Sequence, residues 1–238
     1  LQKPEMKDVF SSCYVLPSLF HTDLDRGFSV IDYSLNKMLA SREALDKLEG
    51  LGIDLKLDFI LNHASVLSKQ FQDIIKNGDK SEYRDFFIDW NKFWEGCGEM
   101  TEDGYIQPDQ KYIKDMFFRK PGLPILMVRF PDGRDVPYWN TFYQQVDVDG
   151  NGRKHYLGQM DLNINSPLVK EFYQQTLKTL AGYGAKIVRL DAFAYAPKEV
   201  GAKNFLNDPG TWDFLQELTD MAQPYGMALL PEIHASYE

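Results

Sequence analysis

The chain has 238 residues, of which 44% are hydrophobic and 26% charged, an ordinary globular composition that can bury a sizeable core. Its formal net charge of −9 argues against a nucleic-acid partner, and no apolar run approaches the roughly 20 residues that cross a bilayer. Cys13 and Cys97 are far apart and fit no metal-ligand spacing, so they are most simply reduced thiols of a cytoplasmic protein.

The first part of the chain predicts a strand, a helix and a second strand. Residues 12–16 (SCYVL) form a short apolar strand, and a polar loop over residues 20–33 follows it. Ser41 can cap a helix that runs to about Leu48, and residues 54–61 (DLKLDFIL) are strand-like. A strand, a helix and a strand in succession favour a parallel sheet.

The alternation of strands and helices breaks after residue 64. Helical fragments at residues 68–78 and 81–94 precede a long stretch with PGLP and PDGRD turns. This stretch is too long for an ordinary barrel loop, and it predicts a small, loop-rich domain inserted after the strand. The predicted organisation is residues 1–64, an inserted domain at 65–165, and residues 166–238.

The alternation resumes at Ser166, a good N-cap that is followed by proline at the first helical position. The helix that follows predicts a buried stripe formed by Leu168, Phe172, Leu177 and Leu180. The remaining predicted elements are a buried strand at 185–191 (AKIVRLD), a helix at 211–226 and a strand at 227–231 (MALLP).

Polar side chains gather where the predicted parallel strands end. Arg189 and Asp191 share one face of a strand, because side chains two residues apart do so. That pair alone is equally compatible with a structural ion pair and with a functional site. Polar clusters also occur at Asn62–His63 and Glu232–His234, and a loop with Asp25 follows the first strand. Polar groups at the C-terminal ends of four parallel strands favour function, because the active site of a (β/α)8 barrel lies there.

Three segments in order, FILNHAS, IVRLDAFAYAPK and LLPEIH, resemble conserved regions of the α-amylase clan of glycoside hydrolases. GFSVIDY, SKQFQDI, the PGLP turn and RLDAFAYAPKEVG more closely resemble the sucrose-phosphorylase branch of that clan. The resemblance covers nearly the whole chain. It implies an α/β fold, namely a (β/α)8 TIM barrel that is partial here, with about four strands and a small domain inserted after the strand that ends at Asn62–His63.

The resemblance implies a retaining double displacement on an α-glucoside. Asp191 stands where the family has its nucleophile, Glu232 where it has its general acid/base, and Arg189 where a cation orients the nucleophile. Gln159 resembles a glutamine that lines the sugar pocket. Gln145 is a competing match, and the helix that follows Gln159 favours the latter. The other sugar-binding positions that the resemblance implies are Asp25, Phe28, His63 and His234.

Retaining cleavage needs one ionised carboxylate as nucleophile and one protonated carboxyl as acid. Arg189 is expected to lower the pKa of Asp191, and burial behind the apolar residues that precede Glu232 is expected to raise the pKa of Glu232. Taken alone, His63 is more simply a structural histidine, and its neighbour Asn62 is expected to be structural.

Phosphorolysis requires cations on the acceptor side of the sugar. Arg119 and Lys120, just before PGLP, are the candidates for binding phosphate, although a solvated loop edge explains them equally well; Arg129 and Arg134 are weaker candidates. The predicted reaction converts sucrose or a related α-glucoside, with phosphate as co-substrate and no cofactor, to α-glucose 1-phosphate. The acceptor stays open among fructose, a phosphorylated fructose, glycerate and glycerol.

Two other functions stay open. A hydrolase or transglucosylase would use the same scaffold with water or a sugar in place of phosphate. A carbohydrate-binding protein without chemistry is the remote alternative, because Asp191 and Glu232 are both present.

Residues 147–152 (DVDGNG) match the first half of a calcium-binding loop. The twelfth position of that pattern is Gly158, where a bidentate glutamate is required, so we expect a polar turn and no metal site. Four strands are half of the family's barrel, and the family's third catalytic carboxylate has no match here. We therefore expect a piece of a longer enzyme that, alone, is inactive or prone to aggregation.

Overall fold

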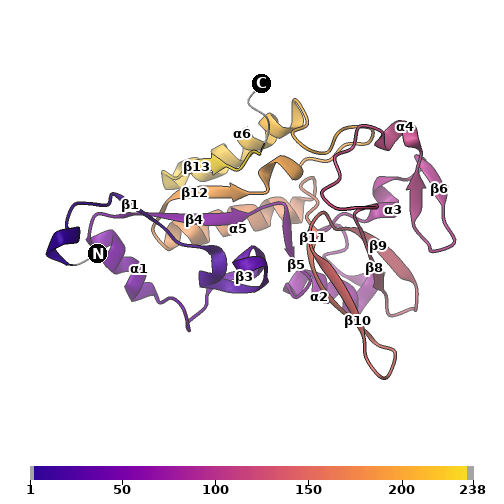
Figure 1. The fold of residues 1–238 in the computed structure, drawn as a ribbon, viewed down its shortest axis with the longest axis horizontal. Coiled ribbons are helices and arrows are strands. Elements are labelled where there is room, and N and C mark those ends of the chain that lie inside the picture. Colours follow the sequence, from indigo (N-terminus) through magenta and orange to yellow (C-terminus); the bar gives the residue numbers. More distant parts are fainter. Residues whose placement is uncertain (1–2, 235–238) are drawn as a thin grey trace.

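Four parallel strands form the central sheet, in the order β1-β4-β12-β13 (Figure 1). The computed structural model describes residues 3–234. The middle strands carry the core, and Leu57, Phe59, Val188 and Leu190 on them are fully buried. The predicted strands and their parallel direction are confirmed. Their bounds are β1 (Ser12–Tyr14), β4 (Asp54–Ile60), β12 (Ala185–Asp191) and β13 (Ala228–Pro231).

Three helices accompany this sheet, and α5 and α6 run along one of its faces (Figure 1). Ser41 caps α1 as predicted, because its hydroxyl accepts a hydrogen bond from the Ala44 N–H at 3.3 Å. α5 begins at Pro167 with Ser166 at the N-cap, as predicted, but the Ser166 side chain accepts no hydrogen bond from the helix. Among residues 3–234, no helix combines the length and apolar character needed to cross a membrane. The helix bounds are α1 (Arg42–Gly50), α5 (Pro167–Gly182) and α6 (Gly210–Ala222).

The buried face of α5 begins one residue later than the predicted stripe. Leu168 is 37% exposed, and Val169 is buried instead. Val169, Tyr173, Leu177 and Leu180 are all buried, and their spacing of four, four and three places them on one helix face. The prediction was wrong at Leu168 because an apolar residue at a helix start can lie on either side of such a stripe.

The segment predicted as a polar loop after β1 is a β-hairpin of β2 (Phe20–Leu24) and β3 (Ser29–Leu35). Phe20, Val30 and Tyr33 are buried in it. The prediction was wrong because the register of the two strands shifts three times, which hides the usual alternation of polar and apolar residues.

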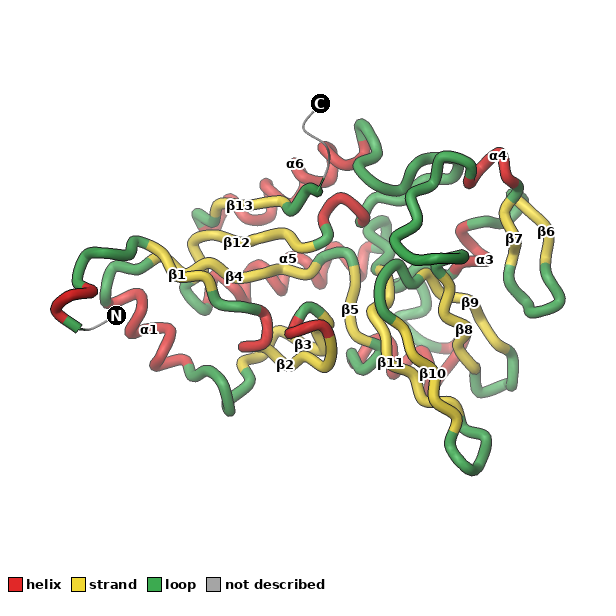
Figure 2. Tube along the Cα trace, viewed as in Figure 1, coloured by secondary structure: helices red, strands yellow, loops and turns green. Residues whose placement is uncertain are grey.

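The other half of the molecule consists mainly of hairpins and loops (Figure 2). β11 lies between β5 and β10, so the strands that open and close this half are paired, with Asp161 opposite His63. The strands are β5 (His63–Ser65), β6 (Gly98–Met100), β7 (Ile106–Pro108), β8 (Ile125–Arg129), β9 (Asp135–Trp139), β10 (Gln144–Val148) and β11 (Lys154–Asp161), and the helices are α2 (Lys69–Asn77), α3 (Trp90–Phe93) and α4 (Gln110–Ile113).

Residues 81–94, predicted to be helical, form only one short helix, α3. Phe86, Phe87 and Ile88 are buried in succession, which a helix with a single buried face does not allow. The chain is extended there instead, and Phe87 forms a β-bridge with Leu162. Consecutive apolar residues therefore indicated a buried extended segment and not a helix.

A second apolar cluster lies inside the hairpin half, separate from the main core. Trp90, Trp94 and Trp139 contact one another there, with ring centroids between 4.8 and 6.3 Å apart. Large aromatic rings bury much area per residue, so a few of them hold together a segment with little regular structure.

Candidate active site

Arg189 on β12 is the centre of a charged cluster near the C-terminal ends of three adjacent strands. Its Nη1 donates to Asp58 Oδ1 at 2.7 Å and to Asp191 Oδ1 at 3.0 Å, and its Nη2 lies 2.7 Å from Glu232 Oε1. The predicted Arg189–Asp191 pair is present. Because β13 pairs with β12, Glu232 joins the same guanidinium.

Asp58 is a member of this cluster that the sequence reasoning missed. It is fully buried on β4, and the Tyr14 hydroxyl donates to its Oδ2 at 2.6 Å. Burial raises the pKa of Asp58, while the hydrogen bonds from Tyr14 and Arg189 oppose that rise. A carboxylate between two apolar residues of a strand, here Leu57 and Phe59, is the signal that identifies it, because a buried carboxylate needs a partner.

Asp191 and Glu232 both contact the Arg189 guanidinium, so the charge of each carboxyl group affects the pKa of the other. Burial and the charge of Glu232 raise the pKa of Asp191 to about 7, against the opposing effect of Arg189. Burial acts to raise the pKa of Glu232 as well, but hydrogen bonds from the Ala192 N–H and from His234, together with the Arg189 charge, lower it. The predicted effects of Arg189 and of burial are both present, but the net directions of the two pKa shifts are the reverse of those predicted, because one cation serves three carboxylates and Glu232 has more donors.

Glu232 is fixed by the turn that follows β12. The Ala192 N–H donates to its Oε2 at 3.1 Å, and His234 Nε2 lies 2.8 Å from its Oε1. Ala192 has a φ of 52°, in the left-handed region, which directs the chain sharply away from β12. The His234 side chain is 84% exposed and contacts Glu232, the second carboxylate of the pair.

A second group of predicted residues meets around Gln159. Its Nε2 donates to Asp25 Oδ2 at 3.2 Å and to the Phe28 carbonyl at 3.3 Å. His63 Nε2 donates to the same carbonyl at 2.9 Å, so four predicted sugar-binding positions lie together. Gln145, the competing match, lies on the exposed strand β10 and donates to a side chain of its own strand.

His63 uses both ring nitrogens within the protein. Besides the bond to Phe28, its Nδ1 lies 3.3 Å from Asn62 Nδ2, which donates to it. Burial lowers the pKa of His63, so the ring is neutral with its proton on Nε2. The Arg189 guanidinium lies 5.6 Å from the centroid of the Phe28 ring, and this contact joins the two groups of site residues.

Arg119 and Lys120 have different environments. Lys120 is half-buried, and its Nζ donates to the Phe142 carbonyl at 2.9 Å and to the Asn140 side chain. Burial lowers the pKa of Lys120 to about 8. Arg119 is exposed, and both cations line a cavity of about 10 Å³, enough for one water, together with Tyr195 from the turn after β12. The two cations therefore lie beside the turn that follows Asp191.

The segment that matches a calcium loop forms the exposed turn between β10 and β11, which is the predicted polar turn. Asp149 Oδ1 accepts hydrogen bonds from the N–H groups of Asn151 and Arg153 at 2.9 and 3.0 Å. Its Oδ2 lies 3.1 Å from His155 Nε2. The carboxylate thus closes the turn, as aspartate commonly does in tight loops.

Comparison with known proteins adds an independent line of evidence. Residues 25–237 match the family model of the alpha amylase catalytic domain. The sucrose 6(F)-phosphate phosphorylase of Ilumatobacter coccineus is 60% identical over 237 residues, which are 100% of this chain and 45% of that protein. The sucrose phosphorylase of Streptococcus mutans is 32% identical over 97% of this chain and 43% of its own length.

A solved structure is similar in fold as well as in sequence. The crystal structure of sucrose 6F-phosphate phosphorylase from Thermoanaerobacter thermosaccharolyticum superimposes with a TM-score of 0.80 and 34% identity, covering 96% of this chain and 43% of that one. The chain therefore spans less than half the length of these relatives.

Proposed function

The chain belongs to the α-amylase family, and we propose from this premise that it forms part of the catalytic domain of a retaining glycoside phosphorylase. The reaction is phosphorolysis of sucrose 6F-phosphate or a related α-glucoside, which gives α-glucose 1-phosphate and, from this donor, fructose 6-phosphate. The 60% identity to a sucrose 6(F)-phosphate phosphorylase supports this donor among those that the sequence left open. Because the chain spans 45% of that relative, the reaction is assigned to the full-length enzyme.

In this proposal the four parallel strands are half of a (β/α)8 barrel. Residues 65–165 are the domain inserted after the strand that ends at Asn62–His63, between barrel segments at 1–64 and 166–238. The pairing of β5 with β11 and the separate tryptophan cluster support that division. Leu1, Gln2 and residues 235–238 lie outside the described part of the chain.

The observation that carries the proposal is the pair of carboxyl groups, Asp191 and Glu232, on adjacent strand ends with Arg189 between them. Retaining cleavage needs two carboxyl groups about 5–5.5 Å apart on either side of the glycosidic bond. When a sugar lies between them, Glu232 must carry the proton and Asp191 must be ionised. An oxygen of the Asp191 carboxylate attacks the anomeric carbon, while Glu232 gives its proton to the departing fructosyl oxygen.

The group around Gln159 would hold the glucosyl ring during this step. Asp25 and Gln159 offer hydrogen bonds to sugar hydroxyls, and the Phe28 ring packs against the apolar face of the sugar. His234, which is exposed, contributes a further hydrogen bond, and His63 does so when a sugar hydroxyl replaces the Phe28 carbonyl at its Nε2. Because burial lowers the pKa of His63, its ring is neutral and adds no charge to the sugar pocket.

The second step reverses the geometry with phosphate as the acceptor. A phosphate oxygen attacks the anomeric carbon of the glucosyl-enzyme, Glu232 takes its proton, and the bond to Asp191 breaks. Two inversions give α-glucose 1-phosphate with retention. Arg119 and Lys120, which lie beside the turn after Asp191, neutralise the phosphate charge.

An assay of the full-length enzyme tests this function. Sucrose 6F-phosphate, sucrose, glucosylglycerate and glucosylglycerol are each incubated with and without phosphate, and glucose 1-phosphate and free glucose are measured. We expect glucose 1-phosphate to form only with phosphate and fastest from sucrose 6F-phosphate. Free glucose formed at the same rate without phosphate would establish a hydrolase, and transfer to added sugar would establish a transglucosylase. No product from any donor would favour a binding protein.

A further inference from the structure

Lys198 is a buried cation in the turn after β12 to which the proposed chemistry assigns no role. Its side chain is 3% exposed. Its Nζ donates to the Tyr195 carbonyl at 2.7 Å and to Asn62 Oδ1 at 3.3 Å, and it lies 2.8 Å from Asp161 Oδ2. Three acceptors match the three protons of an ammonium group, so its direction is fully determined.

Asp161, the partner of Lys198, also accepts several hydrogen bonds. Asp161 is fully buried and accepts hydrogen bonds from the Thr141 N–H at 2.8 Å, the Thr141 hydroxyl at 2.6 Å and Asn62 Nδ2 at 3.2 Å. Asn62 therefore bonds both charges, and its Nδ2 also reaches His63. We call Lys198, Asp161, Asn62 and Thr141 the buried network.

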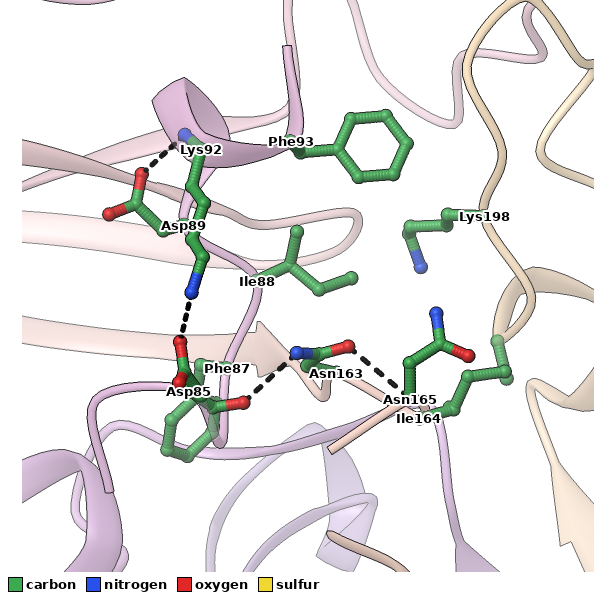
Figure 3. Close-up of a pocket in the computed structure, with 11 residues that line it drawn as sticks. Asp85, Phe87, Ile88, Asp89, Lys92, Phe93, Asn163, Ile164, Asn165 and Lys198 are labelled. Carbon is green, nitrogen blue, oxygen red and sulfur yellow. Dashed lines mark hydrogen bonds and ion pairs between the residues drawn. The ribbon is translucent and has the colours of Figure 1, made fainter. Parts of the chain in front are cut away.

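A pocket of about 260 Å³ lies on the outer side of Lys198 (Figure 3). Lys198 borders it opposite Asp85 and Lys92, which pair with each other at 2.6 Å, with Ile88 and Phe93 between them. Asp161 is not among the residues that line the pocket. The lysine therefore separates Asp161 from this open space, and a shorter side chain would admit water to the buried carboxylate.

We propose that Lys198 is a positioning residue of the active site, an inference that rests on the proposed function. Through Asn62 it orients His63 at the end of β4. Through the Tyr195 carbonyl it fixes the turn that begins at Ala192, whose N–H binds Glu232. One ammonium thus ties together the ends of β4, β11 and β12, and it links the inserted segment to both halves of the proposed catalytic pair.

The buried network differs from an ordinary structural ion pair because its members also hold residues of the proposed active site in position. A structural pair can be replaced by two neutral groups of similar shape with little effect on function. A positioning pair cannot, because a displacement of about 1 Å at the reacting groups costs up to about 100-fold in rate. Burial is the main cause of the lowered pKa of His63, and the charge of Lys198 adds to it, which gives a readout independent of activity.

The test uses four variants of the full-length enzyme: Lys198→Met, Asp161→Asn, the double variant, and Lys198→Arg. Thermal midpoint, kcat and the KM values for donor and phosphate are measured for each. We expect Lys198→Met to be destabilised, because it leaves Asp161 buried and unpaired. The double variant should recover most of the thermal midpoint while its kcat stays at least ~10-fold below the parent value, with the KM for phosphate little changed. Lys198→Arg should keep more activity than Lys198→Met.

A matched control is the exposed pair Lys170–Glu217, which joins α5 to α6 at 2.7 Å. Lys170→Met/Glu217→Gln should leave kcat unchanged.

A double variant of the buried network with parental kcat would overturn the proposal. If the parent enzyme itself forms no glucose 1-phosphate, the proposed function fails instead. NMR titration of His63 then still tests the network. The proposal requires the pKa of His63 to rise in the single variant Lys198→Met, and an unchanged pKa would contradict it.

Discussion

The charged cluster around Arg189, which we call the strand-end cluster, and the buried network both combine a cationic side chain with carboxylates. The two differ in the ratio of positive to negative charges. In the cluster, Arg189 alone faces Asp58, Asp191 and Glu232. In the network, Lys198 faces one carboxylate, Asp161. The cluster therefore carries an excess of negative charge when all its groups are ionised, and the network carries none.

This difference suits the strand-end cluster to proton transfer and the buried network to positioning. Burial of Asp191, together with the negative charge of Glu232, raises the pKa of Asp191 to about 7. In the buried network, Lys198 and Asp161 each have several hydrogen-bond partners, so the pair holds its neighbours in fixed places. Three tests follow, in order of decreasing effect.

The largest effect is expected from the carboxyl pair itself. Asp191→Asn and Glu232→Gln should each lower phosphorolysis by at least ~10³-fold in the full-length enzyme. Their stability effects should differ in sign. The pKa of Asp191 is raised from its ordinary value of 3.8, so the protonated form contributes to the stability of the fold, and this contribution is lost as pH rises through about 7. Asp191→Asn should therefore be more stable than the parent at pH 8 but not at pH 4. The gain should be about 1 kcal/mol or more, measured by thermal unfolding.

Glu232→Gln should behave in the opposite way. The pKa of Glu232 is lowered, so its ionised form stabilises the fold above its ordinary pKa, and this contribution is lost as pH falls. The variant should therefore be less stable than the parent at pH 8. An exposed acid such as Glu95, changed to glutamine, serves as the control and should change neither property. Equal stability effects for both site variants would remove the contrast between the two carboxyl groups.

The second test asks how much Glu232 adds to the rise in the pKa of Asp191 that burial causes. α-Glucosyl fluoride releases fluoride without needing a proton, so formation of the glucosyl-enzyme from it depends on ionised Asp191. In the parent, the rate should rise with pH and reach half its maximum near pH 7. In Glu232→Gln this midpoint should move to lower pH, because the neighbouring negative charge is gone. A midpoint that stays in place would assign the shift to burial alone.

The smallest effects are expected at the phosphate candidates. Arg119→Ala and Lys120→Ala should each raise the KM for phosphate about 10-fold and leave that for the donor nearly unchanged, since a charged hydrogen bond contributes ~1.5–3 kcal/mol. The pKa of Lys120 is about 8, so in the parent the KM for phosphate should rise as pH increases through 8 and the ammonium loses its proton. Arg119→Ala should keep this pH dependence, and Lys120→Ala should lose it.

Arg129 and Arg134 provide the control for that test. Arg129 bonds both oxygens of Asp135 at 2.7 and 2.8 Å, and Arg134 bonds Asp132 at 2.7 Å, so each is neutralised by a neighbour on the same hairpin. Alanine at either position should not change phosphate kinetics. Unchanged phosphate KM values in the Arg119 and Lys120 variants would place the phosphate site elsewhere.

Much of the fold follows from local signals. The strands at 54–60 and 185–191 are short segments rich in Leu, Ile, Val and Phe that follow glycines, and this local pattern identifies them as strands. The hairpin after β1 was not predictable in this way, because its irregular register hides the alternation that identifies strands. The segment before α3 was taken for a helix, because a run of buried residues has no periodicity to separate the two possibilities.

Sequence patterns alone identified Arg189, Asp191 and Glu232, since each ends or follows a recognisable strand. They did not identify Asp58 or the contact of Lys198 with Asn62, because Asp58 lies 131 residues from Arg189 and Asn62 lies 136 residues from Lys198. Nor did they give the protonation of the pair correctly. A pKa depends on burial and on every charge nearby, and both are set when β4, β12 and β13 come side by side. Local sequence therefore identifies the residues of this site, while packing determines their pKa values.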